Sequence, residues 1–347
     1  MDGPPTPAQT PSLVSVVVPT CGRPALLVDA VASVVAQTYE RIELVVVDDG
    51  SDTAEAALHD LPLDALERTA VRSFETNKGA NAARNAGVTA ATGDLVAFLD
   101  DDDWWHPTKL ARQVDALRSA AAGVAFVGQR VVVDDRVTAV RRPSSEGDFT
   151  EQLVAGASLG TFSTVLVRAE AFDRTGPLDE RLPCWQDREW YYRLADHYDF
   201  VAVPEPLVGR RVGVDAHVSD RFEVLRDVAY PRVRAKHRTR ARALGPEYER
   251  QFLATLSAGV GKAALRCGRY PDARRFMARS VRLDPTVPHR YAYLAAALGG
   301  RPVHRVARTG KRTLSRLRDA VESDQASGTH TVFPPGADEL DGVVNAE

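Results

Sequence analysis

The sequence contains few cysteines and no long apolar run. Its three cysteines are Cys21, Cys184 and Cys267. Their wide spacing excludes a disulfide scaffold and a CxxC metal knuckle, and favours a reducing compartment, with the cytosol as the default. No window of about 18 residues, the length that spans a bilayer, is uniformly apolar, and the first residues lack the basic and apolar segments of an export signal. We therefore expect any membrane contact to be peripheral.

The sequence also lacks an excess of one charge. Its 44 Lys and Arg residues oppose 47 Asp and Glu residues, so the net charge is -3. Without a basic field, general binding to nucleic acid is not expected. With 347 residues, of which 44% are hydrophobic, the chain is long enough for an α/β domain of about 200 to 250 residues and an appendage.

The pattern along the chain predicts an α/β domain over residues 13–220. Residues 1–12 are rich in proline and are predicted to be disordered. From residue 13, short β-branched runs alternate with longer amphipathic segments, which predicts βαβ units in a mostly parallel sheet. Ligands bind such sheets at the carboxyl ends of the strands. The polar strings PTCGRP, DDGSD and DDDDWW lie at those ends.

Helix formers dominate after the α/β domain. We expect a helical region over 221–318 and a disordered acidic tail over 319–347, which has seven acidic and no Lys or Arg side chains. Residues 253–298 resemble part of a tetratricopeptide repeat array. Two interpretations stay open for the helical region: it binds a protein partner, or it is a helical cap packed on the catalytic domain.

Six strings in the α/β domain resemble the motifs of family-2 glycosyltransferases of the GT-A fold. In chain order they are VSVVVPTCGRP (14–24), SVVAQTY (33–39), IELVVVDDGSDT (42–53), NKGANAARNAG (77–87), GDLVAFLDDDDWWHPTKL (93–110) and WQDREWYYRLA (185–195). The resemblance implies a mostly parallel, sandwiched sheet and an inverting transfer of a sugar from a UDP-, GDP- or dTDP-linked donor. The implied acceptor is a hydroxyl of a glycan, a lipid-linked molecule or a small molecule, in the assembly of polysaccharide, lipid-linked glycan or glycoprotein glycan.

A run of four aspartates, residues 100–103, follows an apolar strand. Like charges this close raise one another's pKa unless a cation neutralises them, and Mn²⁺ or Mg²⁺ prefers such oxygen ligands. The Asp-x-Asp motif of the family corresponds to Asp100 and Asp102 as metal ligands, with Asp100 or Asp101 directed toward the ribose. Asp103 is expected to cap the following helix. His217 is expected to be a metal or phosphate ligand, or else an exposed loop histidine.

The resemblance also assigns residues that bind the donor. They are Pro19, Thr20, Arg23, Asp48, Asp49, Asn77, Lys78, Gly79, Arg84, Asp100 and Asp101. Asp48 or Asp49 would accept a hydrogen bond from the base, although Asp-Gly-Ser is also an ordinary turn. The guanidinium of Arg84 would reach the diphosphate.

Asp187 is the expected general base. It matches the aspartate of the family's Glu-Asp pair, in which Gln186 here replaces the glutamate. Glu189 is the competing base, and a helix cap is the structural alternative for Asp187. Trp185 is the first candidate for stacking on a sugar ring.

Two basic stretches, residues 232–242 and 301–318, hold six and seven Lys or Arg residues. They are typical either of peripheral contact with an anionic membrane or of a solvated helix face. Two other functions stay open for the whole chain. One is a sugar-phosphate nucleotidyltransferase, against which the single glycine of PTCGRP counts, and the other is a non-catalytic scaffold.

Overall fold

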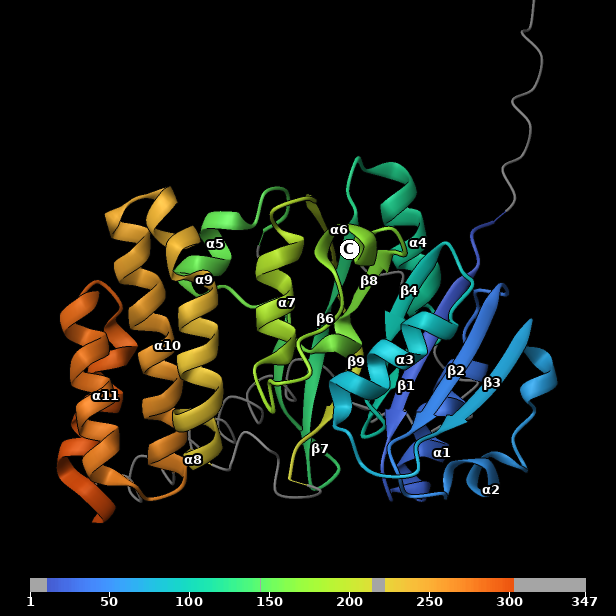
Figure 1. Cartoon of the computed structure of the whole chain (residues 1–347), viewed down its shortest axis with the longest axis horizontal. Coiled ribbons are helices and arrows are strands. Elements are labelled where there is room, and N and C mark those ends of the chain that lie inside the picture. Colours follow the sequence, from blue (N-terminus) through green and yellow to red (C-terminus); the bar gives the residue numbers. More distant parts are fainter. Residues whose placement is uncertain (1–10, 144, 214–221, 303–347) are drawn as a thin grey trace, which may run out of the picture.

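A computed structural model describes residues 11–143, 145–213 and 222–302. Residues 1–10, the acidic tail and His217 lie outside the described part. The α/β domain is built on one nine-stranded sheet with the order β3-β2-β1-β4-β8-β6-β9-β5, and β7 pairs with β6 (Figure 1). The strands are β1 (Val14–Thr20), β2 (Ile42–Asp48), β3 (Arg68–Ser73), β4 (Leu95–Phe98), β5 (Asp103–Trp105), β6 (Val124–Val133), β7 (Arg136–Arg141), β8 (Val165–Arg168) and β9 (Phe200–Arg211).

The α/β fold is confirmed, and its sheet is mixed rather than mostly parallel. Strands β1 to β4 pair in parallel, and so do β6 and β9, whereas β5, β7 and β8 run antiparallel to their neighbours. All seven residues of β1 are buried, because helices cover both faces of the sheet. Val16 and Val18 pack with α1, and Val17 packs with α3. The helices of this domain are α1 (Pro24–Val35), α2 (Ala54–Leu58), α3 (Ala80–Ala90), α4 (Lys109–Ser119), α5 (Thr150–Ala155), α6 (Ala171–Thr175) and α7 (Gln186–Leu194).

The short strand β5 differs from the expectation for the acidic run. Asp103 does not cap a helix, because it pairs with Arg210 of β9 in an antiparallel ladder and α4 begins only at Lys109. Arg210 and Arg211 are the last two residues of β9. The pairing of β5 with β9 therefore makes Asp103 part of the sheet.

The predicted helical region is present over the described residues 222–302 and packs directly on the α/β domain (Figure 1). It comprises α8 (Phe222–Val224), a π-helical turn η4 (Leu225–Ala229), α9 (Tyr230–Leu244), α10 (Pro246–Arg266), α11 (Tyr270–Leu283) and a helix that continues from residue 288 to 302. Phe252, Leu256 and Val260 of α10 share one buried core with residues of the sheet and α7. Within the described ranges, no helix has the length and apolar character needed to cross a membrane.

Candidate active site

Loops from separate strands are linked at the carboxyl edge of the sheet. The carboxylate of Asp49, just after β2, accepts hydrogen bonds from the backbone N–H groups of Lys78 (2.6 Å) and Gly79 (2.9 Å) at the entrance of α3. Gly50 has a φ of +83°, and a Cβ there would lie 2.5 Å from the backbone nitrogen of Asn77. Only glycine allows this approach, so the DDGS and NKG segments form one surface.

Asp48 has a different environment from its neighbour. Its carboxylate accepts hydrogen bonds from the backbone N–H groups of Ser51, Thr53 and Ala54 and from the hydroxyl of Ser51. Burial by itself would raise the pKa of Asp48, but these hydrogen bonds outweigh it and lower the pKa. Asp48 therefore stabilises the turn before α2.

The loop after β1 is joined to the acidic run. The hydroxyl of Thr20 donates to Asp101 at 2.7 Å, and the guanidinium of Arg23 pairs with Asp101 and lies 3.4 Å from Asp102. The Asp101 side chain is 1% exposed. Burial raises the pKa of Asp101 to about 6 although Arg23 opposes the shift. Pro19 is also buried, at the end of β1.

Three aspartates form a cluster that fits a divalent cation. Asp100, Asp102 and Asp103 each offer one carboxylate oxygen, and these oxygens lie within 4.8 Å of one another. Asp103, which the sequence did not predict as a ligand, is buried and accepts a hydrogen bond from the hydroxyl of Ser163 at 2.7 Å. Burial and the two neighbouring carboxylates raise the pKa of Asp103 well above its usual range. A hard cation would relieve this repulsion.

Arg84 connects the acidic run to α7. Its guanidinium lies 2.5 Å from a carboxylate oxygen of Asp100 and donates to the side-chain oxygen of Gln186 at 3.3 Å. It is stacked over the ring of Phe162, 4.2 Å from the centroid, and its side chain is 6% exposed. Packing on the ring of Phe162 and the hydrogen bond to Gln186 therefore hold the guanidinium of Arg84 beside Asp100.

Asp187 lies in the first turn of α7 and faces the same group of charges. One of its oxygens accepts the backbone N–H of Arg188 at 2.7 Å. Burial raises the pKa of Asp187, the negative charge of Asp100 adds to the effect, and Arg188 and Arg210 oppose it. Gln186, the residue before Asp187, accepts a hydrogen bond from Arg84, which also pairs with Asp100. This chain of contacts brings the first turn of α7 near the acidic run.

Glu189, the competing base, is a structural residue. Its side chain is 1% exposed and pairs with Arg193 (2.9 Å), Lys236 (2.7 Å) and His237 (3.0 Å). Burial alone would raise the pKa of Glu189, but these hydrogen bonds and charges lower it to about 2. A carboxylate so fully paired has no free oxygen for an acceptor hydroxyl.

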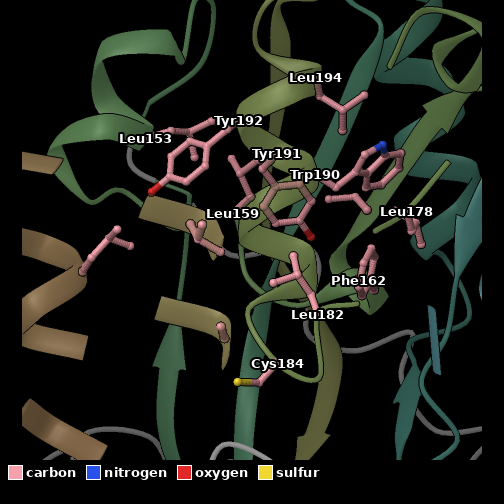
Figure 2. Packing of buried hydrophobic residues seen from close by; sticks show 14 of the residues in the cluster. Leu153, Leu159, Phe162, Leu178, Leu182, Cys184, Trp190, Tyr191, Tyr192 and Leu194 are labelled. Atoms are coloured by element: carbon pink, nitrogen blue, oxygen red, sulfur yellow. The ribbon is translucent and has the colours of Figure 1, made fainter. Parts of the chain in front are cut away.

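The aromatic residues of α7 belong to the core rather than to an open site. Trp190 stacks on Phe172 with 5.2 Å between ring centroids, and the hydroxyl of Tyr191 donates to the carbonyl of Thr161 at 2.9 Å. Figure 2 shows Trp190 and Tyr191 in the buried cluster with Phe162. Tyr192 packs on Phe252 of α10. Trp185, which precedes α7, is partly exposed.

A cavity of about 590 Å³ lies away from these carboxylates. Gly123 and Asp199 in its wall precede β6 and β9, so the cavity is at the opposite edge of the sheet. The Arg168 side chain in its wall is already bonded to the carbonyls of Leu117 and Ala122. This cavity contains none of the predicted site residues.

A mixed sheet covered on both faces, with an acidic cluster at the carboxyl ends of its parallel strands, is the arrangement expected of the GT-A fold. The model of the family "Glycosyl transferase family 2" matches residues 15–173. The chain belongs to this family and is a glycosyltransferase.

Two relatives agree with this assignment. An uncharacterized glycosyltransferase of Nostoc sp. is 30% identical over 217 residues, which cover 59% of this chain and 67% of the relative. The Escherichia coli protein WfaP, named a UDP-Glc:alpha-D-GlcNAc-diphosphoundecaprenol beta-1,3-glucosyltransferase, is 27% identical over 183 residues, covering 52% of this chain and 67% of WfaP.

Residues 1–349 of S. aureus TarS superpose with a TM-score of 0.59 at 18% identity, covering 86% of this chain and 92% of that one. Against the longer TarS structure, the chain spans 49% of its length. At this identity the TarS comparison shows the fold alone.

Proposed function

We propose that this glycosyltransferase moves a sugar from a nucleoside-diphosphate donor to an acceptor hydroxyl with inversion at the anomeric carbon. The observation that carries the proposal is that Arg84 contacts both Asp100 and Gln186, the residue before Asp187, so that a candidate base lies near a candidate metal cluster. An in-line displacement needs a proton acceptor on one side of the anomeric carbon and stabilisation of the leaving diphosphate on the other.

Asp100, Asp102 and Asp103 would hold the cation, Mn²⁺ or Mg²⁺. Three carboxylate oxygens within 4.8 Å of one another, one of them buried, are a suitable donor set for either ion. When bound, the ion would supply Lewis-acid stabilisation of the diphosphate. Arg84 holds Asp100 in place through its ion pair, and Arg23 does the same for Asp101.

Asp187 would take the proton of the acceptor hydroxyl. The acceptor oxygen forms the new bond to the anomeric carbon, the bond from that carbon to the diphosphate oxygen breaks, and the diphosphate departs with the electron pair. A base is most effective when its pKa is near the working pH, so the raised pKa of Asp187 suits it to this step.

The donor would be held by the linked loops at the sheet edge. The joined segments around Asp49 and Gly79, together with Thr20 and Asn77, surround the end of β1 and β2. We propose that the nucleotide binds here. The structure of TarS 1–349 in complex with UDP-GlcNAc and the UDP-Glc donor in the name of WfaP support a UDP-sugar.

The acceptor is proposed to be a glycan or a lipid-linked sugar, as in the name of WfaP. Peripheral membrane contact through residues 232–242 gains no support from the structure, because cations of α9 are used internally. Lys236 pairs with Asp179 and Glu189, and Arg238 pairs with Glu249. Any such contact would depend on residues 301–318, most of which lie outside the described part.

Release of nucleoside diphosphate, assayed with Mn²⁺ over a panel of nucleotide sugars, tests the proposal. A glycosyltransferase releases UDP from a UDP-sugar, a nucleotidyltransferase releases pyrophosphate, and a scaffold releases neither. The change Asp102→Ala should abolish metal-dependent binding of UDP, measured by calorimetry. Unaltered metal-dependent affinity would remove Asp102 from the metal site.

A further inference from the structure

Helix α7, which carries Asp187, is fixed on its inner side by the α/β core. Trp190 packs against Phe98 and Phe172 with centroid distances of 5.8 and 5.2 Å. The hydroxyl of Tyr191 bonds to the carbonyl of Thr161. Figure 2 shows these rings directed from α7 into the buried cluster. The inner contacts therefore belong to the α/β domain alone.

The outer side of the same helix contacts the helical region. Glu189 is bonded to Lys236 and His237 of α9, and the ring of Tyr192 lies 4.9 Å from that of His237 and 5.7 Å from that of Phe252 in α10. Glu189 and Tyr192 are three residues apart and so lie on one stripe of the helix. Trp185, four residues before Glu189, continues this stripe.

The indole of Trp185 packs against α10 at Gly259, where the absence of a side chain makes room for it. A Cβ added at Gly259 of α10 would lie 2.6 Å from Cζ2 of the indole and 3.3 Å from Cη2. Trp185 itself has a left-handed backbone, with φ 60° and ψ 25°. This conformation is costly for a bulky residue and persists only where its surroundings hold it. The indole is therefore held against α10 at the residue just before α7, two positions before Asp187.

We propose that the helical region is part of the catalytic apparatus, in which Gly259 and Trp185 are positioning residues that set the place of Asp187. The contact fixes the first turn of α7, and Asp187 lies in that turn. This inference rests on the proposed role of Asp187 as the base. It assigns α9 and α10 a function in turnover, beyond that of a cap.

The change Gly259→Ala tests the proposal, with Gly261→Ala as its matched control. Alanine favours a helix over glycine by about 1 kcal/mol, so neither change weakens α10 itself. A Cβ at Gly261 meets Met277, whose Cε and Cγ lie 3.0 Å away, and does not meet Trp185. We expect Gly259→Ala to lower kcat by about tenfold to a hundredfold, the cost of a misplaced catalytic group, while the Kd for UDP with Mn²⁺ stays within about twofold. Gly261→Ala should keep kcat within about twofold.

A second change separates positioning from general damage. Phenylalanine lacks the indole atoms that a Cβ at residue 259 would strike, so Trp185→Phe should restore part of the kcat lost in Gly259→Ala. Equal kcat in the two glycine variants would overturn the proposal. So would a kcat for the double variant that is no higher than for Gly259→Ala alone, or a parallel loss of UDP affinity.

The variant Asp187→Asn distinguishes this inference from the function on which it rests. If Asp187→Asn retains turnover, the assignment of the base is wrong. If Asp187→Asn loses turnover and Gly259→Ala does not, the base stands and only the positioning role of the helical region is refuted.

Discussion

Replacing Asp187 by asparagine removes the proposed base with little change of shape. An asparagine oxygen can still accept the N–H of Arg188, the bond that Asp187 makes at 2.7 Å, so α7 should keep its first turn. General-base catalysis contributes about 10² to 10⁴ in rate, and a hundredfold loss corresponds to about 2.7 kcal/mol in the activation barrier. We expect kcat to fall by at least about a hundredfold, with the Kd for UDP within about twofold of wild type.

Glu189→Gln is the matched control, because it neutralises a carboxylate two positions along the same helix. The pKa of Glu189 is lowered from 4.5 to about 2 by its partners, a shift that corresponds to roughly 3 kcal/mol of stability. Because the folded-state pKa is depressed, this stability is fully present above pH about 4.5 and disappears as the pH falls through about 2. Glu189→Gln should therefore unfold more easily at pH 7 and match wild type near pH 2.

The two variants are compared by kcat and by denaturant unfolding at several pH values. We expect opposite outcomes: Asp187→Asn loses turnover at nearly full stability, and Glu189→Gln loses stability while the folded fraction still turns over. If the folded Glu189→Gln protein is inactive and Asp187→Asn is active, the base has been assigned to the wrong carboxylate.

Three further changes probe the charges around the site. Asp103→Asn should weaken Mn²⁺ binding by at least about tenfold, the lower end of the cost of perturbing a metal site, with Asp101→Asn closer to wild type in calorimetry; equal affinities would exclude Asp103 as a ligand. The kcat of the wild type should fall as the pH drops through the raised pKa of Asp187, and Arg210→Gln should move this limb to higher pH, because Arg210 lowers that pKa. An unmoved limb would contradict this. Gln186→Glu adds a carboxylate beside Asp187, so it should move the fall in kcat to higher pH and lower the melting temperature. An unchanged pH profile with an unchanged melting temperature would contradict this expectation.

The sequence predicted the fold because its strongest local signals are regular. The buried β-branched runs of β1, β2 and β4, and the change to helix formers after residue 221, have no competing interpretation. β5 and β7 were not predicted. Each is short, and each exists because it pairs with a strand distant in the chain or across a turn, which is a tertiary cause that local pattern does not contain.

The sequence predicted that aspartates would gather at the end of β4, but it did not predict most of the contacts around them. Asp100 and Asp102 lie together as expected. Asp103 joins them because strand β5 places its carboxylate within hydrogen-bond distance of the Ser163 hydroxyl. All three residues of β5 are buried, so no alternation of apolar and polar side chains marks this strand in the sequence. The ion pair of Arg84 with Asp100 joins residues of α3 and the end of β4, and their distance depends on how the helix packs across the sheet.

Gln186 illustrates how such contacts explain a departure from a family motif. Its amide nitrogen donates to the carbonyl of Leu182 at 2.8 Å, and its oxygen accepts from Arg84 at 3.3 Å. A glutamate could accept from Arg84 but, when ionised, would face the carbonyl oxygen of Leu182 without a proton to donate. It would also compete with Asp100 for the guanidinium. Glutamine satisfies both neighbours and leaves the positive charge of Arg84 to Asp100, so the replacement preserves the link between the acidic cluster and the helix that carries Asp187.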